Sequence, residues 1–314
     1  MAESSGGGGP RDKVLSPLPT LGRRRRTERL VGILLAACAG ISTLVTFGII
    51  AVLLRETAGF FAEVSPLEFL TETRWSPLFR EKHFGILPLL SASLQVAVGA
   101  SLLALPAGLL TAIFLSEYAG ARLRSVLKPM LEVLAGIPTV VYGYFALTFV
   151  TPMIRWLFPG AEVFNAASAA IVLGIMVLPT VSSLSEDALR SVPRSLREAA
   201  YSLGASKMEV TLRVVVPAGV SGVVASFILA LSRAFGETMV VTIAAGSSPQ
   251  LTLNPLEAVQ TMTAYIVQVG LGDTSTGTLE HRTLFAVGMT LFVITLAMNW
   301  AAQRVRDRFP GGAE

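Results

Sequence analysis

Long apolar stretches alternate with short polar stretches along most of this chain. Each apolar stretch is about long enough to cross roughly 30 Å of hydrocarbon as a helix. The six stretches cover residues 30–54, 85–116, 129–157, 163–184, 217–245 and 283–302. The pattern predicts an all-α, polytopic membrane protein with six transmembrane helices, formed by residues 23–308.

The polar stretches also carry structural signals. Residues 1–22 are rich in Gly, Ser and Pro and lack apolar periodicity, so we expect a disordered cytoplasmic tail there. Residues 309–314 form a second, short tail. A short helix is expected at 66–71, and an amphipathic helix or re-entrant segment within the loop at 246–282.

Composition agrees with a membrane protein. Apolar residues make up 52% of the chain and charged residues only 15%, whereas a soluble domain carries about 25% charged residues. Cys38 is the only cysteine, which excludes an intrachain disulfide. His83 and His281 have no cysteine partners, so we expect neither a metal site nor a cofactor.

Basic residues predict the orientation in the membrane. They gather before the first span, between the second and third spans, in the polar loop at 185–216 and at the C-terminal end. Cytoplasmic loops carry such an excess, so both termini and the 185–216 loop are expected in the cytoplasm. The run at Arg23–Arg26 adjoins an apolar span, which favours a topology signal over nucleic-acid binding.

The loop at 185–216 has a distinctive centre. Its sequence predicts a helix that ends at a glycine turn, Gly204, and a second helix from Lys207 to about Val215. Small alanines would let the first helix sit deep in a partner's groove. An ordinary cytosolic helical hairpin is the alternative. The candidate coupling residues are Arg197, Glu198, Ala199, Ala200, Gly204, Ala205 and Lys207.

One arginine lies deep inside a predicted span. Arg233 is near the middle of residues 217–245, where an arginine costs roughly 2.5–3.5 kcal/mol. Glu237 is four residues further on, one helical turn away, and Thr238 follows it. Two interpretations stay open: an ion pair that fixes helix packing, or an anion pathway in which the guanidinium binds an oxyanion.

A second candidate lies in the predicted third span. Gly136, Pro138 and Thr139 form a Gly-x-Pro-Thr break, which frees backbone groups that need partners inside the protein or in a water-filled cavity. Such a break can mark a gate or a transport pathway. A kink that serves packing alone is equally compatible with the sequence.

Three motifs occur in order: Ala135-Gly136-Ile137-Pro138-Thr139-Val140-Val141-Tyr142-Gly143, Glu198-Ala199-Ala200 with Gly204 in the loop at 185–216, and Arg233-Ala234-Phe235-Gly236-Glu237-Thr238-Met239. With these motifs, residues 27–308 resemble the PstC-type permeases of high-affinity phosphate ABC importers. The resemblance implies a type I ABC importer permease bundle with a cytoplasmic coupling helix, in the inner plasma membrane. It also implies that Arg233 and Glu237 are important for phosphate passage.

The resemblance implies partners as well. These are a PstA-like permease in a heterodimer, two PstB-like ATPase subunits and a PstS-like phosphate-binding protein. The chain has no Gly-x-x-x-x-Gly-Lys-Ser/Thr loop, so we expect no ATPase activity of its own. Glu198 would organise the coupling helix, and Arg197 or Lys207 would pair with acidic residues of the ATPase.

Other functions stay open on the residues alone. An ABC permease for another oxyanion, such as sulfate or molybdate, would use the same arginine chemistry. A secondary transporter would work without an ATPase. A non-transporting membrane scaffold that senses phosphate would tolerate loss of Arg233 and Glu237.

Overall fold

The structure is a computed structural model that describes residues 21–308. The predicted tails at 1–22 and 309–314 lie outside this range, except that residues 21 and 22 begin the first helix. The chain divides into two compact units, one up to Val52 and one from Leu53 onward. In the first unit the described residues form only helix α1, Leu21–Phe61, which continues into the second unit.

Helices make up the fold of the second unit. Among the described residues the only strand-like pairing is an isolated bridge between Trp75 and Phe84. Besides α1, the helices and the π-helical turns (η) are α2 (Pro66–Thr71), α3 (Leu87–Ile113), η1 (Phe114–Tyr118), α4 (Ala121–Ala135), α5 (Thr139–Phe145), η2 (Ala146–Val150), α6 (Thr151–Leu157), α7 (Ala166–Ser191), α8 (Arg194–Ser202), α9 (Lys207–Val210), η3 (Thr211–Val215), α10 (Val216–Ala218), α11 (Val220–Phe235), α12 (Met239–Ala244), α13 (Met262–Leu271) and α14 (Leu279–Arg308).

Five described helical segments are long and apolar enough to cross a membrane. They are Glu28–Phe61, Leu87–Tyr118, Thr139–Leu157, Ala166–Ser191 and Leu279–Val305. A bent pair, Lys207–Ala218 and Val220–Phe235, turns by 68° at its break and gives the sixth span if it is counted as one. The all-α, six-span class is therefore confirmed. The short helix predicted at 66–71 is α2, and the helix expected in the 246–282 loop is α13.

Two predicted spans differ from the structure. The third, at 129–157, is not one helix, because α4 ends at Ala135 and the span begins at Thr139. The proline at 138 lacks a backbone N–H, so it starts a new helix instead of kinking an old one. The fifth, at 217–245, is interrupted between Phe235 and Met239.

The bundle core rests on close packing of α3 against α7. Glycines allow this approach: a Cβ atom built on Gly108 would lie 2.6 Å from Cγ1 of Val181, and one on Gly174 would lie 2.9 Å from the carbonyl oxygen of Ala100. Small residues at such crossings let helix backbones come close in a membrane, where van der Waals packing replaces the hydrophobic effect as the main attraction.

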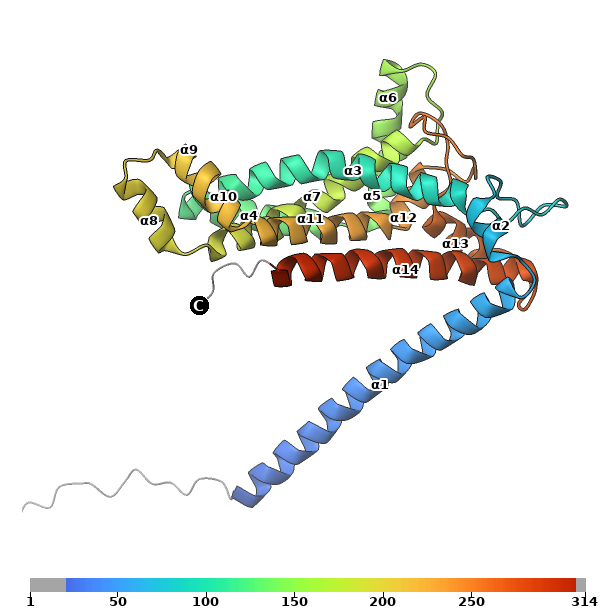
Figure 1. The fold of residues 1–314 in the computed structure, drawn as a ribbon, viewed down its shortest axis with the longest axis horizontal. Coiled ribbons are helices and arrows are strands. Elements are labelled where there is room, and N and C mark those ends of the chain that lie inside the picture. The colour runs from blue at the N-terminus through green and yellow to red at the C-terminus, as the bar shows by residue number, and fades with distance from the viewer. Residues whose placement is uncertain (1–20, 309–314) are drawn as a thin grey trace, which may run out of the picture. The chain divides into compact units, whose positions relative to one another are not determined.

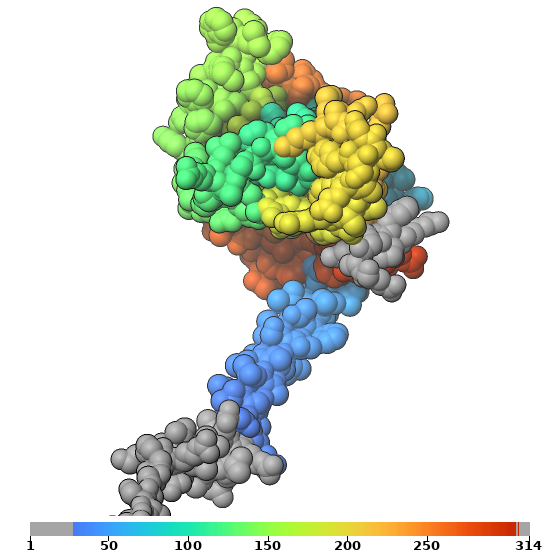
Figure 2. All heavy atoms as spheres, turned by 90° about the vertical axis from the view of Figure 1, so that its left-hand side faces the viewer, coloured from blue at the N-terminus to red at the C-terminus, as the bar shows by residue number. Residues whose placement is uncertain are grey.

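Within the second unit, α3, α7, α11 and α14 lie lengthwise beside one another (Figure 1). Helices α8 and α9 lie at one end of this bundle, and α2 and α13 lie at the other. Figure 2 looks onto the first end, where the yellow α8–α10 region lies beside the green region that holds η1 and α4. The polar loop is therefore a folded cap on one end of the bundle.

Candidate functional site

The polar loop folds as the sequence predicts. Pro193 precedes α8, and the chain then turns at Gly204, whose φ of +82° lies in the left-handed region that glycine adopts without strain. Ser206 begins α9 with a capping box shared with Glu209. The Ser206 backbone N–H and hydroxyl both donate to the Glu209 carboxylate.

Arg197 fastens α8 to the bundle. Its Nη2 donates to Oε1 of Glu117 at 3.1 Å and to the carbonyl oxygen of Leu189 at 2.8 Å, and its Nη1 donates to the carbonyl oxygen of Val192 at 2.5 Å. These carbonyls lie at the C-terminal end of α7, where backbone oxygens lack intrahelical donors, although the Leu189 oxygen also accepts the backbone N–H of Val192. The side chains of Arg197 and Glu117 are only 16% and 7% exposed. Arg197 therefore has a carboxylate partner within the chain, and the expected pairing of Arg197 or Lys207 with an ATPase stays a prediction.

Lys207 is exposed, and its Nζ lies 4.8 Å from the ring centroid of Tyr118 in η1. Ala200 and Ala205 pack against a small apolar cluster that joins α3, α7 and α11. Ala199 and Glu198 are exposed. Of the predicted coupling residues, Arg197, Ala200, Ala205 and Lys207 contact other parts of the chain, whereas Glu198 and Ala199 are exposed, and Glu198 also lines the cavity described below.

Apolar side chains of the loop remain uncovered. Leu203 is 89% exposed, and Leu196, Tyr201 and Met208 are exposed as well. Helix α8 has no buried residue, and these uncovered apolar side chains leave a surface for another molecule.

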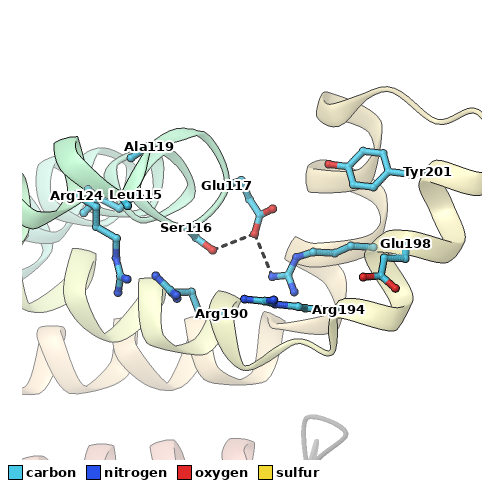
Figure 3. Close-up of a pocket in the computed structure, with 11 residues that line it drawn as sticks. Leu115, Ser116, Glu117, Ala119, Arg124, Arg190, Arg194, Glu198 and Tyr201 are labelled. Carbon is cyan, nitrogen blue, oxygen red and sulfur yellow. Dashed lines mark hydrogen bonds and ion pairs between the residues drawn. The ribbon is translucent and has the colours of Figure 1, made fainter.

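A cavity of about 520 Å³ lies between the loop and the bundle. It is lined by Leu115, Ser116, Glu117, Ala119, Ala121, Arg124, Arg190, Arg194, Arg197, Glu198 and Tyr201. Figure 3 shows that Arg124, Arg190 and Arg194 extend toward it from three different elements. The lining is rich in arginine and has carboxylates at Glu117 and Glu198.

A buried carboxylate behind this cavity was not predicted. Glu186 of α7 is 0% exposed, and its Oε1 accepts from Nε of Arg124 at 2.6 Å. Lys128 lies 3.4 Å from the other oxygen, and Arg190 lies 3.8 Å from Oε1. Residue 186 falls in the predicted loop at 185–216, where an acidic side chain would be solvated. The site was missed because α7 continues to Ser191 and so includes Glu186.

Arg233 does not form the predicted pair with Glu237. Helix α11 ends at Phe235, so the one-turn relation is lost, and no ion pair joins the two residues within the described chain. Nη1 of Arg233 instead donates to Oγ1 of Thr180 at 3.0 Å. A Glu237 oxygen accepts the backbone N–H of Met239 at 3.2 Å, at the start of α12. The guanidinium is exposed and has no carboxylate within ion-pair distance among the described residues.

The two predicted pathway segments meet through their following helices. A Cβ atom on Gly143 of α5 would lie 3.2 Å from the carbonyl oxygen of Met239 and 3.0 Å from the side chain of Ile243, both in α12. Helix α5 begins at Thr139, directly after Gly136 and Pro138, and α12 follows Glu237 and Thr238. The sequence placed these residues in separate spans, and the structure places α5 and α12 in direct contact.

The fold is that of the permease subunits of ABC importers. A chain of a bacterial alginate ABC transporter matches with a TM-score of 0.63 over 92% of this chain and 97% of its own, at 16% identity. A chain of the MetNI methionine ABC transporter matches with a TM-score of 0.53 over 71% of this chain and 94% of its own, at 20% identity. At these identities the likeness concerns the fold alone.

The chain belongs to the family of binding-protein-dependent transport system inner membrane components, whose model matches residues 104–309. It is a multi-pass membrane permease subunit that works with ATPase and binding-protein partners, and the subunit itself is not an enzyme.

Curated relatives cover most of the chain. The probable ABC transporter permease protein YqgH of Bacillus subtilis is 37% identical over 74% of this chain and 75% of its own. The phosphate transport system permease protein PstC of Mesorhizobium japonicum is 34% identical over 82% and 83%. PstC 2 of Mycobacterium tuberculosis is 30% identical over 90% and 92%.

The buried carboxylate gives a test of how α4 is held. Glu186→Gln removes the charge that Arg124, Lys128 and Arg190 share, which leaves cations without compensation. We expect a loss of about 3 kcal/mol in stability and faster hydrogen exchange across α4. Thermal melting of the purified protein and hydrogen-exchange mass spectrometry measure these effects.

The neighbouring Asp187 supplies the matched control. Its side chain is 60% exposed and contacts Lys128 at 3.3 Å, so Asp187→Asn is expected to change little. Equal effects of the two substitutions would show that burial of Glu186 is not what holds α4.

Proposed function

We propose that the chain is the PstC-type permease of an importer that carries inorganic phosphate into the cytoplasm. The observation that carries this proposal is the free guanidinium of Arg233. A membrane-embedded arginine without a carboxylate partner has a net positive charge and unused donors, which favour an oxyanion. The relatives named phosphate transport system permease protein PstC support phosphate as that oxyanion.

The residues around Arg233 receive supporting roles. Thr180 orients the guanidinium through its hydroxyl. Glu237 and Thr238 shape the break between α11 and α12, while Gly136, Pro138 and Thr139 shape the break before α5. Contact of α5 with α12 would let both breaks move together as the pathway opens.

The contact with the ATPase is at the end of the bundle that carries α8 and α9. We place both termini and the α8–α9 hairpin in the cytoplasm, in agreement with the bias of basic residues. The exposed face around Leu203 then meets one of two PstB-like ATPase subunits. A PstA-like permease completes the heterodimer, and a PstS-like protein delivers phosphate on the outer side.

Coupling relies on the inward contacts. ATP-driven closure of the ATPase subunits moves α8, and the contacts of Arg197 with α7 and Glu117 carry that movement into the bundle. Glu198 and Ala199 face the ATPase, whereas Ala200, Ala205 and Lys207 keep the hairpin on the bundle. The bundle alternates between outward and inward access.

The cargo can be tested with Arg233. In proteoliposomes that hold the full transporter, Arg233→Ala is expected to lower phosphate uptake at least about tenfold, because a charge-assisted contact worth roughly 1.5–3 kcal/mol is lost. Arg233→Lys keeps the charge without the planar fork and should retain part of the rate. Radiolabelled phosphate uptake is the measurement.

Arg155→Ala, at the end of α6, is the control and should leave uptake unchanged. Full uptake by Arg233→Ala would contradict the pathway role. Uptake of sulfate or molybdate in place of phosphate by the unaltered transporter would identify a different oxyanion as the cargo.

The glycine turn tests the coupling role. Gly204→Val forces a β-branched residue to φ +82°, although nothing lies within 4 Å of its Cβ, so the strain is in the backbone. Uptake and transport-coupled ATP hydrolysis should both fall, while membrane insertion persists. Gly120→Val, also with open space but with φ −67°, is the control. Normal phosphate uptake by the Gly204→Val variant would contradict the coupling role of the hairpin.

A further inference from the structure

The arginine-lined cavity between α8 and the bundle has no role in the pathway described above. It lies next to the hairpin, and none of the proposed pathway residues is part of its lining. Its volume of about 520 Å³ is ample for a small anion. Its walls come from η1, α4, the end of α7 and α8, so an occupant would contact the hairpin and the bundle at once.

Charge in the lining is unevenly neutralised. Glu117 is already occupied, since it accepts from Arg197 at 3.1 Å and from Oγ of Ser116 at 2.9 Å. Arg194 has no hydrogen bond or ion pair in the part of the chain that the structure describes, and Arg190 reaches Glu186 only at 3.8 Å. These two guanidiniums therefore keep most of their donors.

The third arginine is held in place. Nε of Arg124 bonds to the buried Glu186 at 2.6 Å, which fixes the planar group at the cavity edge. Figure 3 shows Arg124, Arg190 and Arg194 reaching toward the same space from α4, α7 and α8. Glu198 is the remaining carboxylate of the lining, and it is exposed. Arginine forks in this arrangement match the oxygens of a phosphate group.

We infer that this cavity is a second, cytoplasmic-side site that binds a phosphate group through Arg190, Arg194 and Arg124. Two sources share this chemistry: free inorganic phosphate and the headgroup of an anionic phospholipid. A bound phosphate group ties α8 to α4 and α7 and so restrains the hairpin. If the occupant is free phosphate, this restraint of the hairpin is inhibition by the imported product. That consequence rests on the proposed function, whereas the binding site itself does not.

The first arm of the test uses free phosphate. The full-length chain carries Arg233→Ala to remove the candidate pathway ligand and is held in phosphatidylcholine nanodiscs. Inorganic phosphate is titrated by calorimetry at ionic strength kept constant with KCl. We expect saturable binding that added Arg190→Gln/Arg194→Gln weakens at least about tenfold. Arg122→Gln, also on α4 but outside the cavity lining, is the control and should bind as before.

The second arm uses phosphatidylglycerol nanodiscs and counts retained lipid by native mass spectrometry. Lipid retention that is lost in Arg190→Gln/Arg194→Gln but kept in Arg122→Gln assigns the site to the headgroup. Binding that ignores the two arginines in both arms, or is absent from both, overturns the inference.

A folding defect is kept apart from a binding defect by Arg194→Gln alone. This side chain has no partner in the described chain, so the variant should melt like the unaltered protein and still bind more weakly. Neither arm measures transport. If Arg233→Ala had normal uptake, the second site would be unaffected. If neither binding arm supported the second site, the proposed cargo would be unaffected.

Discussion

The contact of Arg197 with Glu117 and with the end of α7 is the interaction on which the functional organisation depends. One guanidinium donates to two carbonyls at the end of α7, neutralises a nearly buried carboxylate and holds α8 against the bundle. A surface salt bridge contributes little, but a shielded pair with further hydrogen bonds fixes geometry. The hairpin therefore joins the bundle as a rigid extension and not as a flexible loop.

The basic side chains at the end of the bundle differ from the arginine in the fifth predicted span in whether they have a carboxylate partner. Arg197, Arg124 and Lys128 have carboxylate partners, whereas Arg233 has only the hydroxyl of Thr180. An unpaired guanidinium in a span is costly, and the proposed anion pathway would give this arginine an oxyanion as its partner. The break after α11 is the structural reason for this difference, because it moves Glu237 from the face of Arg233 to the start of α12.

Much of this organisation could be predicted from the sequence. Apolar length identified the spans, and the glycine at 204 and proline at 193 mark the helix ends around the hairpin. Helix ends were the weak point. The break at Gly136–Pro138 was identified but placed inside one span, and the end of α11 at Phe235 was not predicted, because apolar residues resume at Met239. The assumption of an unbroken helix created the false Arg233–Glu237 pair.

Contacts between distant segments could not be predicted at all. Glu117 lies 80 residues from Arg197, and Arg124 lies 62 residues from Glu186. Nothing in the local pattern of either acid distinguishes it from a solvated loop residue. Only the packing of η1, α4, α7 and α8 at one end of the bundle brings these charges together and forms the cavity between them.

The most direct test of the coupling contact is the number of phosphate ions imported per ATP hydrolysed in the reconstituted transporter. The ratio is compared for Glu117→Ala, Arg197→Ala and the double variant. If Arg197 transmits the movement through its shared contact, each single change lowers the ratio and the double variant is no worse than Arg197→Ala. Losses that simply add, or a ratio that stays unchanged, would contradict the role of this contact.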